Sequence, residues 1–202
     1  MAEPPERYAL VMCDAQPDLL NSLPEEARSE LLRNLQQLLE GARRANWQIV
    51  FTGLRFPSGY AGVPKRHRVF GGLQRLNEKQ GDERVHWFME GFPGTDIAPD
   101  LAPLEGEEVL WRQRMRPDDR LLDVLRAKNI TKVAVAGLKT GQGVLQAAEL
   151  LADDGLLLYL APLVLALSAK YAMNIEGVAV MLPKNCTYCS AKPQRSGLNH
   201  SA

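Results

Sequence analysis

Three residues that follow apolar runs in this chain could carry out acid–base or anion-binding chemistry. Asp14 follows the run YALVMC, and Arg112 follows the run EVLW. A carboxyl group at the end of a buried strand can act as a general acid, and an arginine can hold a carboxylate through two parallel hydrogen bonds. Gln16 lies two residues after Asp14 and adds an amide that could position a substrate.

A glycine-rich turn, GLKTGQG at residues 137–143, lies between the apolar run KVAVA and a helical pattern. Such a turn is a common place for a nucleophile or a bound anion, yet this one contains no Cys, Ser or His. It also lacks the GxxxxGK[ST] spacing of a nucleotide-binding P-loop. Lys139 and Thr140 are expected to line a binding pocket. The alternative is that Lys139 only covers the turn and that Gly143 only permits close packing of helix on sheet.

The cysteines and histidines do not predict a metal site or a cofactor. Cys13 lies inside an apolar run and is expected to be a small core residue. The CTYC pair at residues 186–189 has the spacing of a redox or metal motif, but zinc would need two more ligands and only His200 is near. His67 and His86 have no partner at ligand spacing and are expected at the surface.

Strands and helices alternate along the chain, which predicts an α/β fold: a mostly parallel sheet with helices on both faces, in three layers. The first expected helix begins at the capping-box pattern Ser22-Leu-Pro-Glu25. The next helix has Pro117 in its first turn. We predict strands at 8–13, 47–52, 108–111, 132–137, 156–160 and 178–182, and helices at 22–42, 117–128, 143–155 and 168–177.

The carboxyl ends of the predicted parallel strands define one candidate site. Ligands of open parallel sheets bind beyond these ends, where Asp14, Arg112 and the glycine-rich turn all fall. Residues 53–107 are rich in Gly, Pro and Arg, and we expect a long irregular excursion over the surface. The whole chain, residues 1–202, is expected to form a single domain with a loosely ordered tail from about Lys184.

Composition narrows the expected partners. The formal net charge is zero and no basic cluster is interleaved with aromatic residues, so neither nucleic acid nor a membrane surface is expected as a partner. A small-molecule ligand fits better. The amino-terminal residues resemble no secretion signal, which favours a cytoplasmic location. The apolar segment APLVLAL at residues 161–167 suggests a surface buried in a homo-oligomer.

Four segments, in the correct order, resemble the isochorismatase-like (cysteine hydrolase) superfamily over nearly the whole chain. They are ALVMCDAQPDLLNS, FPGTDIAPDLAP, the long block from EVLWRQRMRPDD to AAELLADDG, and SAKYAMNIEGVAVML. The resemblance implies the fold of this superfamily and a relationship to its hydrolases.

The resemblance also implies a degenerate catalytic triad. The family's triad is an aspartate, a lysine and a cysteine nucleophile, and the matching positions hold Asp14, Arg112 and Gly143. A glycine has no atom that could attack a carbonyl, so thiolate amidase or nicotinamidase activity is not expected. The histidines that bind zinc in nicotinamidases are also missing from residues 52–57.

Two functional hypotheses follow from the resemblance. True isochorismatases are similar in having glycine at this position, so Asp14 could act as general acid on a vinyl ether such as isochorismate. Arg112 would then hold a substrate carboxylate, which implies an anionic ligand. The alternative is a catalytically inactive relative that acts as a binding or interaction module. Two plainer interpretations also stand: Asp14 caps a turn, and Arg112 belongs to a solvated row with Arg114 and Arg116.

Overall fold

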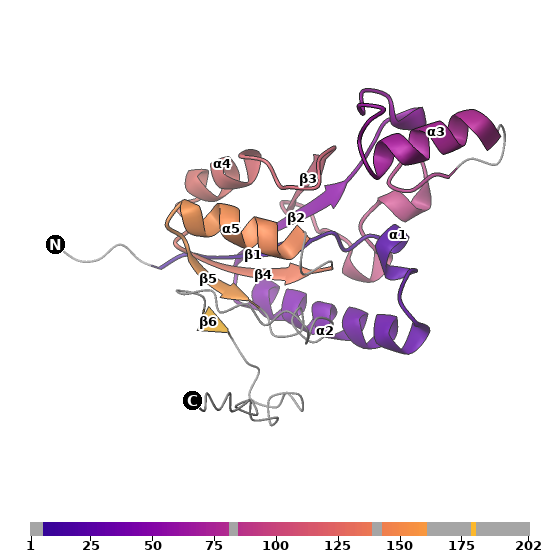
Figure 1. Cartoon of the computed structure of the whole chain (residues 1–202). Helices are drawn as coiled ribbons and strands as arrows, with labels where there is room; N and C mark the ends of the chain where they lie inside the picture. Colours follow the sequence, from indigo (N-terminus) through magenta and orange to yellow (C-terminus); the bar gives the residue numbers. More distant parts are fainter. Residues whose placement is uncertain (1–5, 81–84, 139–142, 161–178, 181–202) are drawn as a thin grey trace, which may run out of the picture.

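A computed structural model describes residues 6–80, 85–138, 143–160 and 179–180, and a parallel β-sheet lies at its centre (Figure 1). The strand order is β3-β2-β1-β4-β5-β6, and every neighbouring pair is parallel. The strands are β1 (Tyr8–Cys13), β2 (Gln48–Leu54), β3 (Glu108–Arg112), β4 (Lys132–Gly137), β5 (Leu157–Leu160) and β6 (Ala179–Val180). The predicted parallel sheet is confirmed.

Helices cover both faces of the sheet, as the sequence predicts. Figure 1 shows α2 (Glu25–Arg44) on one face and α4 (Arg120–Ala127) with α5 (Leu145–Asp153) on the other. The short α1 (Pro17–Leu20) connects β1 to α2. The buried side of α2 carries apolar residues three or four positions apart, which places them on one face of the helix. These residues are Leu31, Leu35, Leu39 and Ala42.

The central strand β1 is buried on both faces. Residues 9–13 are all fully inaccessible to solvent, because helices lie above and below them. A parallel strand covered in this way reads as a continuous apolar run rather than an alternating one. This is why the sequence predicts the bounds of β1 so closely.

The beginnings of two helices differ from the sequence prediction. Ser22 does not cap α2, because its Oγ donates a hydrogen bond to the carbonyl of Leu19 at 2.6 Å. Pro24 occupies the N-cap position instead. The helix α4 begins at Arg120 rather than at Pro117, because the Asp118 carboxylate accepts the Arg120 backbone N–H at 3.2 Å. In both cases a local hydrogen bond competes with an early start of the helix.

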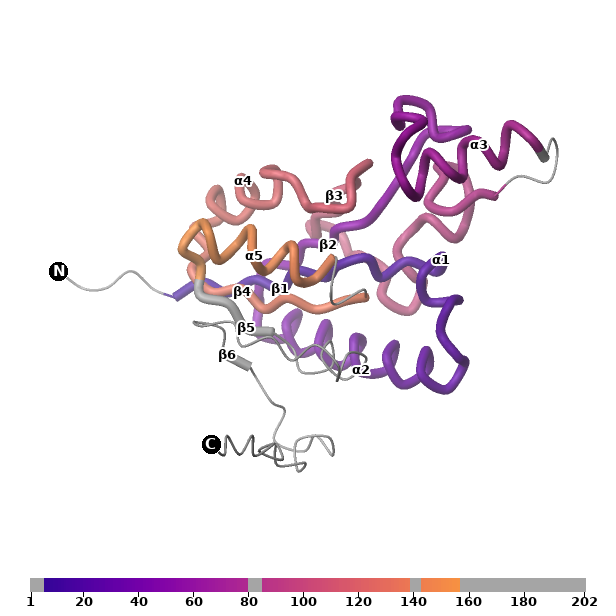
Figure 2. Tube along the Cα trace, viewed as in Figure 1, coloured from indigo at the N-terminus to yellow at the C-terminus, as the bar shows by residue number. Residues whose placement is uncertain are grey.

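The expected irregular excursion is partly helical and has its own packed interior. It contains α3 (Phe70–Gln80) and three short 3-10 turns, at Ser58–Tyr60, Pro93–Thr95 and Pro99–Leu101. Residues 56–80 and 85–92, here called the lobe, stand beyond the edge of the sheet (Figures 1 and 2). Aromatic rings pack together inside the lobe, with 4.1 Å between the ring centroids of Phe56 and Phe70. The local pattern did not reveal α3 because Gly71 and Gly72 interrupt it.

The two histidines of the lobe are half-buried rather than at the open surface. The His67 ring lies 5.4 Å from the Phe70 ring, and the His86 ring stacks on Phe92 at 3.7 Å. Both therefore contribute to the aromatic packing of the lobe.

Several sequence predictions fall outside the described residues: the helix at 168–177, the segment 161–167, the tail from Lys184, and the cysteines 186 and 189. No helix in the described part of the chain is both long and apolar enough to cross a membrane.

Candidate functional site

Asp14 and Arg112 form a buried ion pair at the carboxyl edge of the sheet. Arg112 Nη1 donates to Asp14 Oδ1 at 2.7 Å, and Nη2 donates to Oδ2 at 2.8 Å. Their side chains are only 3% and 4% exposed. Because β2 lies between β1 and β3, the Arg112 side chain reaches across the end of β2 to meet Asp14.

The backbone at Asp14 holds the carboxylate in this position. Asp14 has a φ of 56°, in the left-handed region. This conformation costs a non-glycine residue roughly 1–2 kcal/mol, although aspartate adopts it more readily than most. The Asp14 N–H donates to the carbonyl of Thr52 at 2.8 Å, which ties the turn to β2. Both carboxylate oxygens bond to Arg112, so the side chain does not sit as a simple turn cap.

Arg112 is not part of a solvated row of arginines. Arg114 and Arg116 are exposed, whereas Arg112 is 4% exposed. Arg112 Nη2 also donates to the carbonyl of Met115 at 3.3 Å. The two-pronged end of the guanidinium is therefore occupied by groups of the chain itself. A ligand carboxylate could use the same two nitrogens only by displacing Asp14.

Gly143 meets this ion pair directly. A Cβ atom built on Gly143 would lie 2.2 Å from Asp14 Oδ2 and 3.3 Å from Asp14 Cγ. Side-chain carbons are essentially never found this close to an oxygen, so any side chain at position 143 requires the Asp14 carboxylate to move. The observed geometry of the Asp14–Arg112 pair is therefore compatible only with glycine at position 143.

The end of β4 lies unusually close to the end of β1, and Gly137 allows this. A Cβ at Gly137 would lie 1.9 Å from the carbonyl oxygen of Cys13, and its φ is 135°. No other residue fits here without a backbone shift. The Leu138 N–H donates to the same Cys13 carbonyl at 2.9 Å. This contact joins the end of β4 to the residue just before Asp14.

Gln16 is engaged differently from the sequence prediction. It is fully buried, and its amide nitrogen donates to the carbonyl of Leu54 at 2.8 Å and to the carbonyl of Thr95. Its Oε1 accepts the Leu54 N–H at 2.8 Å. Both amide hydrogens are used, so the predicted substrate-positioning role does not fit this geometry. Gln16 instead joins the ends of β1 and β2 to the turn at Pro93–Thr95.

Of the six predicted site residues, the structure brings Asp14, Arg112 and Gly143 to one point. Lys139 and Thr140 lie in residues 139–142, outside the described part of the chain.

Cys13 is not suited to act as a nucleophile. It is fully buried, and burial, together with the negative charge of Asp14, raises the pKa of its thiol to about 12. A thiol with such a pKa holds almost no thiolate near neutral pH. It is the only cysteine within the described residues. In that same part of the chain, no three His, Cys, Asp or Glu side chains gather closely enough to hold a metal ion.

Arg55 is a residue of this edge that the sequence reasoning missed. It directly follows β2, and its guanidinium carbon lies 3.7 Å from the centre of the Trp111 ring. It forms an ion pair with Asp96, and its backbone N–H donates to the carbonyl of Arg112 at 3.0 Å. The signal was present: like Asp14, Arg55 is a charged residue immediately after a buried strand.

Comparisons with known proteins agree with this fold. Residues 8–162 match the family model described as Isochorismatase domain. An isochorismatase family protein from Desulfovibrio vulgaris subsp. vulgaris str. Hildenborough has a TM-score of 0.64 at 20% identity, covering 79% of this chain and 82% of that chain. The N-carbamoylsarcosine amidase from Thermoplasma acidophilum has a TM-score of 0.60 at 18% identity, covering 78% and 83%.

The pyrazinamidase of Pyrococcus horikoshii, solved in complex with zinc, is a further structural relative. Its TM-score is 0.58 at 18% identity, and the match covers 78% of this chain and 85% of that chain. Identities this low establish a shared fold and nothing about substrate. The comparison with curated proteins found no match.

Proposed function

Because the chain belongs to the isochorismatase family, we propose that it is a non-catalytic member whose catalytic position is filled by its own Asp14–Arg112 ion pair. Such a protein would act as a binding or interaction module.

One observation carries this proposal. A Cβ atom at position 143 would lie 2.2 Å from Asp14 Oδ2. In the resemblance to cysteine hydrolases, position 143 is that of the nucleophile. A carboxylate oxygen of the chain therefore lies too close to this point for the side chain of a nucleophile to be placed there. Cys13, with a thiol pKa raised to about 12 by burial, cannot act in its place.

The energetics of the pair support a structural role. Removing two charges from water is expensive, and two short hydrogen bonds help to offset that cost. Breaking such a pair by removing one partner typically costs about 3–5 kcal/mol. A ligand that needed Asp14 or Arg112 free would have to overcome a comparable penalty from its own binding energy. We therefore regard the pair as a fixed part of the fold.

The test is a search for turnover by the purified full chain. Nicotinamide and other simple amides would be assayed for ammonia release, and isochorismate for pyruvate release. We expect neither product above the buffer rate, and no difference between the natural chain and Asp14→Asn. An active member of the family serves as positive control. Product formation that disappears in Asp14→Asn would overturn the proposal.

A second candidate function is general-acid hydrolysis of a vinyl ether. Asp14 favours it, because its left-handed backbone aims a carboxyl group at the edge of the sheet where ligands of this fold class bind. In this mechanism a substrate carboxylate takes over the two nitrogens of Arg112 and frees Asp14 to pick up a proton. Asp14 then protonates the enol-ether carbon, and water adds to the oxocarbenium carbon while its proton returns to Asp14. Collapse of the hemiketal releases pyruvate and the ring alcohol.

The second candidate makes its own prediction for Arg112→Lys. An ammonium group cannot hold a carboxylate through two parallel bonds, so KM for isochorismate would rise while pyruvate release remained detectable. Pyruvate release that is independent of Asp14 and Arg112 would exclude this mechanism.

A further inference from the structure

The exposed side of α3 carries two adjoining stripes of different chemistry. With 3.6 residues per turn, Arg75 and Lys79 fall along one line of α3 and Leu76 falls along the next. Arg68 and Val69 lie in the turn that leads into the helix and extend these two rows. The Leu73 N–H donates to the Val69 carbonyl at 3.1 Å, so Val69 directly flanks the first turn of α3. Val69 is 49% exposed and Leu76 is 37% exposed.

The cationic stripe is not neutralised by its surroundings. Neither Arg68 nor Lys79 has an ion-pair or hydrogen-bond partner within the described residues. Lys65 pairs with Glu78 at 3.1 Å, and Arg75 donates to the carbonyl of Lys65. Residues 64–84 contain six Lys or Arg residues against Glu78, Asp82 and Glu83. A local excess of positive charge therefore lies on a chain whose formal net charge is zero.

Gly72 lies between the two stripes, and no packing contact requires a glycine at this position. Gly71 is required by packing, because a Cβ there would lie 2.5 Å from the carbonyl oxygen of Lys65. Gly72 is different: the nearest atom to its Cβ position is Arg75 Nη2, at 3.9 Å. Glycine inside a helix costs about 1 kcal/mol relative to alanine. Packing inside the lobe therefore does not require Gly72. Its effect is to leave the helix backbone uncovered between a cationic and an aliphatic row of side chains.

We propose that this face of α3 docks an acidic segment of a partner protein. Carboxylates of the partner would pair with Arg68 and Lys79, and aliphatic side chains would cover Leu76 and Val69. Gly72 would let the main chain of the partner approach the helix closely. This docking surface is separate from the Asp14–Arg112 pair and does not depend on the function proposed for that pair.

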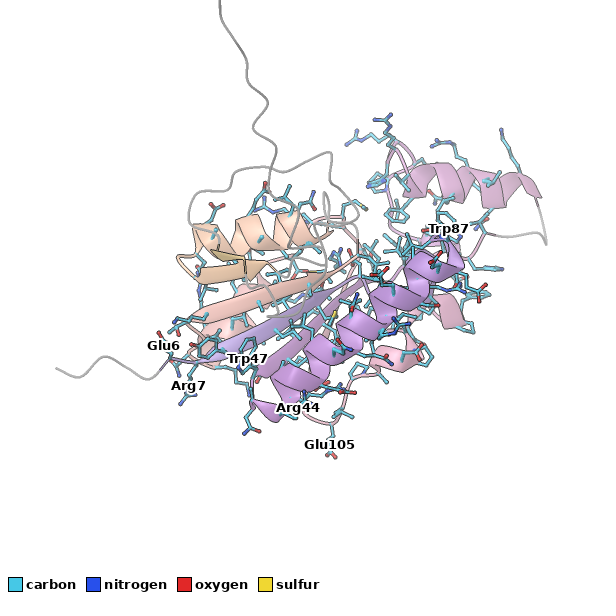
Figure 3. The ribbon with its side chains drawn as sticks, turned by 90° about the horizontal axis from the view of Figure 1, so that it is seen from below. Glu6, Arg7, Arg44, Trp47, Trp87 and Glu105 are labelled. Atoms are coloured by element: carbon cyan, nitrogen blue, oxygen red, sulfur yellow. The ribbon has the colours of Figure 1, made fainter. Side chains whose placement is uncertain are left out.

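The chemistry of the face favours a protein over other polyanions. Nucleic-acid surfaces commonly add aromatic rings on which bases stack, and the two stripes of α3 contain none. Two partly exposed aliphatic residues offer little area for insertion into a bilayer. A glycine between a cationic and an aliphatic row of side chains suits a protein partner, which can present acidic and aliphatic side chains in fixed positions. Figure 3 shows the lobe helix away from the sheet, with some of its side chains extending outward.

The experiment measures binding of a synthetic peptide to the full chain. The probe is a labelled helical peptide of about four turns, with Glu along one line and Leu and Ala along the next. We expect a Kd on the order of 10 μM that weakens as salt is added. The double variant Arg68→Glu/Lys79→Glu should weaken binding at least about tenfold.

Matched controls separate this surface from general charge effects. The double variant Arg33→Glu/Arg44→Glu makes the same change in net charge on exposed positions of α2 and should change Kd by less than about twofold. Gly72→Ala should raise Tm, because alanine favours the helix, and still weaken peptide binding by at least about fivefold.

Three results would overturn the proposal. One is a peptide Kd weaker than about 1 mM, and another is equal weakening by the two charge-reversal variants. The third is tighter binding to phosphatidylserine vesicles or to a single-stranded oligonucleotide than to the peptide, which would assign the face to a membrane or a nucleic acid.

Discussion

At the scale of single residues, Asp14 is the centre of the site. Its backbone is left-handed, both of its carboxylate oxygens bond to Arg112, and its Oδ2 fills the space beside Gly143. The three residues therefore cannot be changed independently. A cysteine at position 143 would push against a carboxylate that the Arg112 guanidinium holds in place.

We expect Gly143→Ala to lower the free energy of unfolding by about 1–3 kcal/mol, because the added methyl group meets Asp14 Oδ2. The cost should shrink when the same change is made in an Asp14→Ala background, where that oxygen is absent. Urea unfolding of the four chains of this double-mutant cycle measures the difference. Gly41→Ala is the control: nothing lies within 4 Å of its Cβ position in α2, so alanine should stabilise the helix. An equal cost in both backgrounds would contradict the coupling.

At the scale of elements, a few side chains tie the non-sheet segments to the sheet. Gln16 connects the ends of β1 and β2 to the turn at Pro93–Thr95. At the other end of the excursion, just before β3, Arg43 of α2 donates two hydrogen bonds to the Glu107 carboxylate, both at 2.7 Å. Because these ties join distant parts of the chain, they decide where the excursion leaves and rejoins the sheet.

Replacing Gln16 by leucine should lower the free energy of unfolding by about 3 kcal/mol. The substitution removes three hydrogen bonds and leaves the buried Leu54 N–H and C=O groups without these partners. Urea unfolding provides the measurement, and Gln37→Leu, at an exposed position of α2, is the matched control. A near-zero cost at Gln16 would argue against its role as a brace and return it to the list of possible ligand-binding residues.

Stability should also depend on pH through Glu107. Burial raises the pKa of Glu107, but hydrogen bonds from Arg43 and from the Leu104 N–H outweigh it and leave the pKa below the usual 4.5. The ion pair therefore contributes fully above pH 4.5 and loses its contribution as the pH falls through the lowered pKa of the folded state.

Glu107→Gln should accordingly cost about 1 kcal/mol at neutral pH and flatten the loss of stability in acid. Thermal unfolding from neutral pH to below the usual carboxyl pKa tests this. Glu105→Gln is the control, because Glu105 lies at the tip of its loop with its side chain in solvent (Figure 3). The same acid profile in Glu107→Gln and the natural chain would show that the pair does not contribute.

At the scale of the whole molecule, two regions are set apart. The sheet and its covering helices hold the buried ion pair, and the lobe, which contains α3, stands beyond the sheet edge (Figure 2). Substitutions on the docking surface proposed for α3 therefore leave both residues of the Asp14–Arg112 pair in place. This is why charge reversal on α3 is expected to change binding without changing stability.

The aliphatic segment at residues 161–167 leads us to propose self-association of the chain. Sedimentation at micromolar concentration should show a dimer or a larger species, and Val164→Glu should shift the chain toward the monomer. The control Leu104→Glu changes a residue that is 57% exposed elsewhere in the chain and should leave the assembly unchanged. A natural chain that sediments as a monomer would contradict self-association.

The sequence by itself determined the class of fold and the position of the site. Continuous apolar runs such as YALVMC indicate strands buried on both faces, and alternation with helices requires a parallel sheet. Because the carboxyl ends of parallel strands gather at one edge, Asp14, Arg112 and Gly143 could be expected near each other.

Only the tertiary structure decided how these residues are used. Arg112 bonds to Asp14 because the strand order places their strands on either side of β2, and sequence spacing does not contain that order. Gln16 is a brace because two carbonyls from other segments reach it. Local patterns report periodicity along one segment, whereas these contacts depend on distances between segments far apart in the chain. For that reason the sequence predicted which groups would meet, and the packing determined that they bond to each other.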